Sequence, residues 1–322
     1  MPQSVFLTGA TGFVGGAILR RLVDDKKSPI VVALRLSSQS LPLDVTTAHF
    51  ETFDASTPWE GCFTGVGTVI HSAARVHVMN DTEVDPLSAF RKVNVEGTLN
   101  LARKAAAAGV RRFIFISSIK VNGEGTSTGS VYRADDVPAP VDPYGISKLE
   151  AEQGLHVVAA ETGMEVVIIR PVLVYGPGVK ANFFTMMRWL DKGVPLPFGA
   201  IHNRRSLVAL DNLVDLVVTC IDHPSAANET FLVSDNEDLS TTQLLKKMAE
   251  ALGKPARLLA IPSWILQTGA IFFGRKSLSQ RLCGSLQVDI GKTQSLLGWI
   301  PPISVDDALK VTAQYFQEHQ TK

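Results

Sequence analysis

Short apolar segments recur along the first half of the chain and are typical of strands that are buried on both faces. Apolar residues are consecutive in these segments, as in parallel sheets that helices cover on both sides. The predicted strands are Ser4–Thr8, Ile30–Arg35, His49–Phe53, Thr68–His71, Arg112–Ile116 and Glu165–Arg170, and the predicted helices are Phe13–Asp24, Pro86–Ala108 and Pro143–Glu161. This alternation predicts an α/β fold with a doubly wound parallel sheet.

The pattern changes near Gly176, where glycine and proline become frequent and the alternation of strands and helices weakens. We therefore expect residues 1–175 to form the sheet domain and residues 176–322 to form mainly a smaller C-terminal lobe. A segment near 205–235 is expected to return to the core, with Thr230–Val233 as an additional strand.

The charges of the 322-residue chain balance, with 31 Lys and Arg against 31 Asp and Glu. A protein that binds nucleic acid by neutralising phosphates carries excess positive charge, so we expect no nucleic-acid partner. Cys62, Cys220 and Cys283 form no C-x-x-C pair, which predicts reduced thiols, a cytoplasmic protein and no metal site. The apolar stretch Ile261–Gly274 is shorter than the roughly 20 residues of a membrane span, so none is expected.

A glycine-rich turn follows the first predicted strand and opens the first predicted helix. Its sequence is G-A-T-G-F-V-G, at residues 9–15. Glycine permits the tight turn and the close approach of a pyrophosphate, which binds the free N–H groups at the start of the helix. The motif predicts a dinucleotide site that contains Gly9, Thr11, Gly12, Phe13, Val14 and Gly15.

The end of the second predicted strand bears on the choice of dinucleotide. An NAD site usually has Asp or Glu there to bond the ribose 2′-hydroxyl, but this chain has Arg35. A guanidinium group suits the 2′-phosphate of NADP. We therefore expect NADP(H) as the preferred cofactor and NAD(H) as the alternative. Asp54, after the third predicted strand, is a candidate to accept from the adenine amino group or to cap its own loop.

The candidate catalytic residues are Ser118, Tyr144 and Lys148, with Ser117 beside them. Tyr144 and Lys148 are four residues apart on a predicted helix, so they share one face. A cation beside the phenol favours the phenolate, which predicts that Tyr144 exchanges a proton with a substrate oxygen near neutral pH. Ser118 ends a strand at the same edge of the sheet and is expected to orient that oxygen.

Three further polar residues near these motifs are weighed as structural or functional. His71 ends a buried strand and is expected to satisfy backbone groups rather than perform chemistry. His77 follows in a loop that faces the expected substrate, so a contact with it is an open alternative. Lys120 is interpreted as either a substrate contact or a solvated side chain.

Markers over almost the whole chain resemble the extended short-chain dehydrogenase/reductase family, in its NAD-dependent epimerase/dehydratase (sugar-nucleotide) branch. They are G-A-T-G-F-V-G at 9–15, V-I-H-S-A-A at 69–74, N-V-E-G-T at 94–98, F-I-F-I-S-S at 113–118, Y-G-I-S-K at 144–148, R-P-V-L-V-Y-G-P at 170–177 and L-G-W-I-P-P at 297–302. The resemblance implies a Rossmann-type dinucleotide-binding domain with the catalytic residues at 1–175 and a substrate-binding lobe mainly at 176–322.

The resemblance also assigns roles to individual residues. It implies that Ala73, Ala74, Asn94 and Pro171 line the cofactor site together with the residues named above, including Tyr144 and Lys148. It further implies that the diphosphate and nucleotide of a UDP-sugar contact Asn182, Arg205 and Arg281, with Ser118 and Tyr144 at the sugar. In this family, the helices at 86–108 and 143–161 pair with their copies, so a homodimer is expected.

The residues after Ser118 bear on the activity. The family's 4,6-dehydratases carry Asp and Glu there, whereas this chain has Ile119 and Lys120, which argues against dehydration. Arg35 favours NADPH and therefore a 4-keto reductase over an epimerase. V-I-H-S-A-A-R-V-H-V at 69–78 and S-S-I-K-V-N-G at 117–123 resemble the O-antigen reductases of the family. This resemblance implies a UDP-linked 2-acetamido-2,6-dideoxy hexulose as the substrate, in O-antigen precursor synthesis. The alternatives are a UDP-hexose 4-epimerase with tightly held NAD, a steroid-type hydroxy-dehydrogenase and a non-catalytic dinucleotide-binding regulator.

Overall fold

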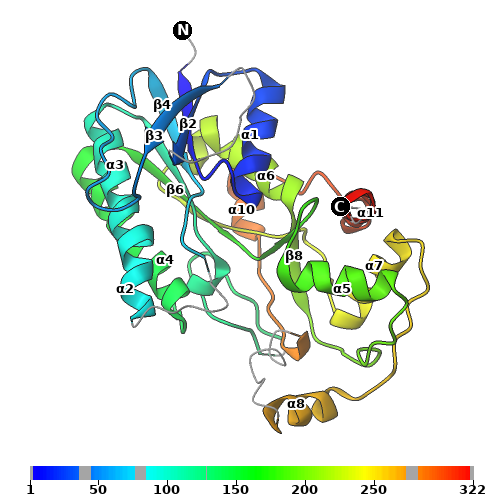
Figure 1. The fold of residues 1–322 in the computed structure, drawn as a ribbon. Helices are drawn as coiled ribbons and strands as arrows, with labels where there is room; N and C mark the ends of the chain where they lie inside the picture. The colour runs from blue at the N-terminus through cyan, green and yellow to red at the C-terminus, as the bar shows by residue number, and fades with distance from the viewer. Residues whose placement is uncertain (1–2, 36–44, 77–84, 128, 273–281, 320–322) are drawn as a thin grey trace.

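The computed structural model describes residues 3–35, 45–76, 85–127, 129–272 and 282–319. A seven-stranded parallel sheet is flanked by helices on both faces (Figure 1), in the order β3-β2-β1-β4-β5-β6-β9. The strands are β1 (Ser4–Thr8), β2 (Ile30–Arg35), β3 (Thr46–Phe50), β4 (Val66–His71), β5 (Arg112–Ile116), β6 (Glu165–Pro171) and β9 (Thr230–Val233). The doubly wound, Rossmann-type sheet predicted from the sequence is therefore confirmed.

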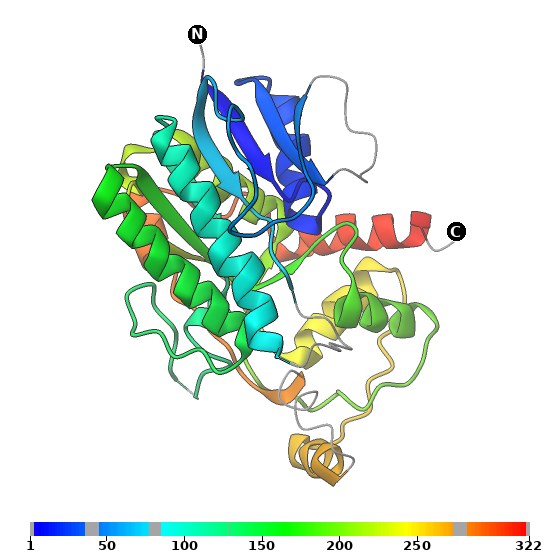
Figure 2. The same cartoon turned by 60° about the vertical axis from the view of Figure 1, so that its left-hand side comes forward.

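Consecutive strand residues supply two separate cores, which explains the uninterrupted apolar runs. In β5, Ile114 and Ile116 join the core beneath α1 (Phe13–Asp25) and α6 (Leu210–Asp222). Phe113 and Phe115 join the opposite core, beneath α3 (Thr98–Ala107) and α4 (Pro143–Thr162). Figure 2 shows α3 and α4 side by side on one face of the sheet. Their pairing with a second copy stays a prediction.

Two predicted elements differ from the structure. The third strand was expected at His49–Phe53 but lies at Thr46–Phe50, because this strand is at the edge of the sheet and its first residues are polar and exposed. The helix expected at Pro86–Ala108 is divided into α2 (Pro86–Arg91), a π-helical stretch at Lys92–Gly97 and α3.

The C-terminal part of the chain contains a small sheet and further helices. The small sheet contains β7 (Leu173–Tyr175), β8 (Arg205–Ala209) and β10 (Asp238–Leu239), and the helices are α5 (Ala181–Asp191), α7 (Thr241–Ala251), α8 (Ser263–Phe272), α10 (Gly291–Leu297) and α11 (Val305–His319). The small sheet, α5, α7 and α11 share a core of their own, whereas Leu297 of α10 joins the core beneath α1 and α6. In both views α8 lies away from the large sheet (Figures 1 and 2). Of the helices described, none is long and apolar enough to cross a membrane.

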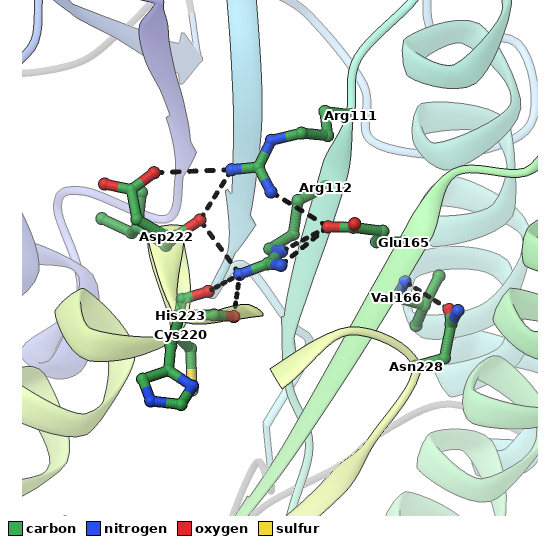
Figure 3. Close-up of polar contacts among 9 residues, drawn as sticks. Arg111, Arg112, Glu165, Val166, Cys220, Asp222, His223 and Asn228 are labelled. Carbon is green, nitrogen blue, oxygen red and sulfur yellow. Dashed lines mark hydrogen bonds and ion pairs between the residues drawn. The ribbon is translucent and has the colours of Figure 1, made fainter. Parts of the chain in front are cut away.

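Arg112 fastens α6 to the amino end of β5, as Figure 3 shows. Its side chain is 1% exposed and donates to the carbonyl oxygens of Cys220, Ile221 and His223 at 2.7, 3.1 and 2.9 Å. These carbonyls lie at the C-terminal end of α6, where a cation is favourable. Glu165, at the start of β6, accepts from Arg112 Nε at 2.8 Å. This anchor is at the opposite end of β5 from Ser118.

Candidate functional site

The glycine-rich turn lies at the carboxyl end of β1, against the segment that follows β4. Gly9 has a φ of +76°, and a Cβ there would lie 2.7 Å from the backbone nitrogen of Ala73. A Cβ on Gly15 would overlap the carbonyl oxygen of Gly9. Ser72 Oγ donates to the carbonyl oxygen of Thr8 at 2.8 Å, which joins the two segments. Both glycines are therefore required by close backbone approach.

The start of α1 is suited to an anion. Gly12 is its N-cap residue, and among the residues described no side chain caps this end and no acidic residue lies in the first turn. The first N–H groups of a helix lack intrahelical acceptors and carry the positive end of the helix dipole. A pyrophosphate fits this position, as the motif predicts.

Asn94 connects the segment after β4 to α4. Its side chain is buried in the π-helical stretch, where Oδ1 accepts from the backbone nitrogen of Arg75 at 2.8 Å. Its Nδ2 donates to the carbonyl oxygen of Arg75 at 3.1 Å and to Ser147 Oγ at 3.0 Å. Asn94 thus holds the segment that contains Ala73 and Ala74 against the helix that carries Tyr144. Its contact with a cofactor stays a prediction.

The three other predicted cofactor residues lie on separate elements. Arg35 is exposed at the end of β2, and Pro171 is buried at the end of β6 beside Val233 of β9. Asp54 caps its own loop: Oδ1 accepts from Ser56 N at 2.9 Å and Ser56 Oγ at 2.6 Å. These bonds, with Lys92 nearby, lower the pKa of Asp54. The capping alternative is the one that the structure shows, and the adenine contact stays a prediction.

Ser118, Tyr144 and Lys148 meet where β5 ends against α4. Asp142 caps α4 by accepting from the backbone nitrogen of Gly145 at 2.6 Å, which sets the start of the helix just before Tyr144. Ser118 Oγ accepts from the backbone nitrogen of Lys120 at 3.3 Å. The Ser118 hydroxyl lies close enough to that of Tyr144 to lower its pKa. Lys148 Nζ lies 6.0 Å from the centre of the Tyr144 ring. The structure therefore brings the three predicted catalytic residues together.

The surroundings shift the proton affinities of this trio. Burial, and then the negative charge of Asp142, raise the pKa of Tyr144, while the neighbouring hydroxyl of Ser118 opposes them. Burial lowers the pKa of Lys148 to about 7, and the charge of Glu152 opposes this. The prediction that the nearby cation lowers the pKa of Tyr144 is wrong for the protein chain on its own. Burial of the phenol raises its pKa instead.

The sequence interpretation missed a buried ion pair one helical turn beyond Lys148. Glu152 accepts from Arg170 Nε at 3.0 Å and from Arg170 Nη2 at 2.6 Å. Ser117 Oγ also donates to Glu152, and Arg170 Nη1 donates to Asn122 Oδ1 at 3.0 Å. A signal was available in the sequence. Glu152 follows Lys148 by four residues, as Lys148 follows Tyr144, so all three are expected on one face of the helix.

Two of the three further polar residues can be placed. His71 is fully buried, with ring nitrogens 2.7 Å from Thr8 Oγ1 and 2.8 Å from Thr98 Oγ1. Its partners are side-chain hydroxyls, and burial together with Lys148 holds its pKa well below the usual range. Lys120 forms ion pairs with Glu124 at 2.9 Å and with Asp142. His77 lies outside the described residues.

The predicted substrate residues of the C-terminal part lie on different elements. Asn182 is exposed in the first turn of α5. Arg205 begins β8 and donates from Nη1 to the carbonyl oxygen of Gly284 at 3.2 Å. Arg281 lies outside the described residues. Contact of these residues with a UDP-sugar stays a prediction.

The sheet, the glycine-rich turn and the Ser-Tyr-Lys trio together define a dinucleotide-dependent enzyme. The model of the NAD dependent epimerase/dehydratase family matches residues 5–234, and the chain belongs to this family. The resemblance inferred from the sequence markers is thereby confirmed.

Particular relatives are similar over their whole length. The chain is 50% identical over 317 residues to a UDP-glucose 4-epimerase of Vibrio cholerae, covering 98% of this chain and 96% of the relative. It is 26% identical to an N-acetyl-alpha-D-glucosaminyl-diphospho-ditrans,octacis-undecaprenol 4-epimerase of Escherichia coli O157:H7, covering 100% and 98%. The crystal structure of UDP-glucose 4-epimerase with UDP-glucose from Thermotoga maritima matches with a TM-score of 0.78 and 25% identity, covering 98% and 99%.

Proposed function

We propose that this protein is a UDP-hexose 4-epimerase that uses NAD. The observation that carries the proposal is the neighbouring pair of hydroxyl groups on Ser118 and Tyr144, with Lys148 beside them, at the sheet edge that also holds the glycine-rich turn. The 50% identity to a UDP-glucose 4-epimerase supports this reaction over the 4-keto reduction that Arg35 had favoured.

The chain's own groups perform the proton transfer in this proposal. Tyr144 takes the proton of the sugar 4-hydroxyl and returns it to the same oxygen, while Ser118 holds that oxygen by a hydrogen bond. Bound NAD supplies a reversible hydride acceptor for C4. Lys148 supplies positive charge beside the phenol and thereby favours its phenolate form when the proton leaves. The configuration at C4 would invert because the hydride would return to the opposite face of the sugar.

The remaining binding groups follow from the same proposal. The start of α1, which no side chain caps, holds the pyrophosphate of the cofactor. The segment that contains Ala73 and Ala74 lies beside Gly9 and lines the same cofactor site. The diphosphate and nucleotide of the UDP-sugar are held by Asn182, Arg205 and Arg281. A guanidinium group suits the diphosphate because it can donate two parallel hydrogen bonds to phosphate oxygens. Residues 1–175 thus bind mainly the cofactor, and residues 176–322 bind mainly the substrate.

The test incubates the purified protein with UDP-glucose, and separately with UDP-N-acetylglucosamine, without any reductant. Proton NMR at C4 should show the 4-epimer, with no net change of absorbance at 340 nm after equilibrium. Absence of the 4-epimer with both sugars, under conditions where NAD binding is measured, would overturn the proposal.

A second candidate is the 4-keto reductase, and one observation favours it. Arg35 ends β2 where a site for NAD usually has a carboxylate. A reductase would oxidise one NADPH for each UDP-4-keto-sugar converted, with the product's configuration fixed at C4. A non-catalytic regulator would bind the dinucleotide and catalyse neither reaction. The same assay with a UDP-4-keto-sugar and NADPH separates these cases.

A further inference from the structure

Three consecutive residues at the end of β5 contact one face of α4. The carbonyl oxygen of Ile116 accepts from Lys148 Nζ at 2.8 Å. Ser117 Oγ donates to Glu152, and the hydroxyl of Ser118 lies beside that of Tyr144. The helix partners are four residues apart, so they lie on one face. Glu152 therefore supplies one of three contacts that set the register between β5 and α4.

The Glu152 carboxylate is fixed from a third element. Its side chain is 2% exposed, and both of its oxygens accept from the Arg170 guanidinium of β6, at 3.0 and 2.6 Å. Arg170 is held in turn by Asn122 Oδ1 at 3.0 Å. Hydrogen bonds from Arg170 and Ser117 to both oxygens fix the position and orientation of this buried carboxylate. Ser117 is consequently bonded to a fixed acceptor.

We propose that Glu152 is a positioning residue, which holds Ser118 in register with Tyr144 through Ser117 and places a negative charge one helical turn from Lys148. The inference rests on the proposed function, because it assigns Glu152 a role in the chemistry of Ser118, Tyr144 and Lys148. It has two separable parts, one geometric and one electrostatic.

The electrostatic part follows from the groups around Lys148. They are Glu152 and Tyr144 on α4 and His71 at the end of β4, with the Phe115 ring 4.3 Å from Nζ. His71 is kept neutral by burial, and Arg170 is paired with Glu152. Burial lowers the pKa of Lys148, and Glu152 raises it. Removal of this carboxylate therefore lets Lys148 lose its proton at lower pH.

The first experiment is Glu152→Gln, which keeps the shape of the side chain and removes its charge. The titration of Lys148 is followed by NMR in protein labelled with ¹⁵N-lysine, and Lys148→Met identifies the signal. We expect the midpoint to move to lower pH by about one pH unit. The matched control is Glu150→Gln, because Glu150 lies on the same helix but pairs with Arg91 at the surface. An unchanged midpoint in Glu152→Gln overturns the electrostatic part.

The second experiment is Ser117→Ala, which removes one hydrogen bond and leaves the Glu152–Arg170 pair intact. It also serves where Glu152→Gln does not fold. We expect kcat for epimerisation to fall about tenfold or more, with KM unchanged, because the hydroxyl of Ser118 loses its alignment. The Lys148 midpoint should stay in place. Retention of the wild-type kcat overturns the geometric part.

The two failures are distinguishable because the lysine titration requires no substrate. A wild-type protein without 4-epimerase activity would overturn the proposed function, while the Glu152→Gln midpoint would still decide the electrostatic part. The geometric part would then be read from kcat for reduction of a UDP-4-keto-sugar, since the same trio serves that reaction.

Discussion

Lys148 donates a hydrogen bond from Nζ to the carbonyl oxygen of Ile116, at 2.8 Å, although its side chain is only 2% exposed. The bond joins α4, on the face that also carries Tyr144 and Glu152, to the last residue of β5. A buried ammonium is costly without compensating partners. Its pKa of about 7 places the loss of its proton within the working pH range of most enzymes.

We predict that Lys148 makes the stability of the protein depend on pH. Its pKa is about 7 in the fold and 10.5 as the ordinary value, so the unfolded chain holds more protons between these limits. The free energy of unfolding that it contributes therefore rises with pH across this window. The difference in unfolding free energy between wild type and Lys148→Met should grow in favour of wild type from about pH 7 to about pH 10. Urea denaturation at several pH values measures it, and a constant difference would contradict the lowered pKa.

Replacement of Tyr144 by Phe removes the hydroxyl that exchanges the proton. We expect kcat to fall about 10²- to 10⁴-fold, while KM for the UDP-sugar changes little because the ring remains. Initial rates of 4-epimer formation measure this. Tyr315→Phe is the control, since Tyr315 lies on α11 and stacks on His319. Turnover near the wild-type rate in Tyr144→Phe would remove Tyr144 from the mechanism.

Gly15→Ala tests the glycine-rich turn. The added Cβ would overlap the carbonyl oxygen of Gly9, so the turn must open and the start of α1 must move. We expect NAD binding to weaken about tenfold or more by calorimetry, because the backbone no longer approaches the pyrophosphate. The neighbouring Gly16→Ala is the control: its Cβ lies 3.1 Å from Ala10 O, which needs a shift of a few tenths of an ångström. Equal binding by both variants would argue against this site.

The sheet was predictable because each of its central strands is apolar on both faces. The edge strand β3 was misplaced by three residues, since Thr46 and Thr47 face solvent and carry no apolar signal. The π-helical stretch around Asn94 was also missed, because one extra residue in a turn leaves the apolar periodicity nearly unchanged.

The candidate site was predictable where spacing along one element sufficed. The separation of Tyr144 and Lys148 and the position of Ser118 at a strand end placed the trio correctly. The direction of the Tyr144 pKa was wrong, because the extent of desolvation depends on packing between elements. Arg170 was missed as a partner of Glu152 for a related reason: the two residues meet only when β6 lies beside β5 and α4 covers both.

Arg112 should support stability without affecting catalysis. Its guanidinium holds three carbonyl oxygens at the end of α6 and the Glu165 carboxylate (Figure 3). Arg112→Met removes the donor of the three carbonyl oxygens, and we expect a loss of about 1–3 kcal/mol in unfolding free energy. The kcat of the folded protein should persist, since the trio lies at the other end of β5.

The matched control for this prediction is Arg111→Met. Arg111 pairs with the same Glu165 at 3.0 Å, but its side chain is 39% exposed. Surface pairs contribute about 0–1 kcal/mol, so urea denaturation should show a much smaller loss. Equal losses of unfolding free energy in the two variants would mean that the buried Arg112 stabilises the protein no more than the exposed Arg111.

Arg35→Asp tests the choice of dinucleotide. An aspartate at the end of β2 accepts from a ribose 2′-hydroxyl and repels a 2′-phosphate, so the ratio of Kd for NADP to Kd for NAD should rise about 10- to 100-fold. Calorimetry with both dinucleotides measures the ratio. Arg20→Asp, on α1, changes the net charge equally and should leave the ratio unchanged. An unchanged ratio in Arg35→Asp would show that Arg35 does not face the 2′ position, which would remove the observation that favours the reductase.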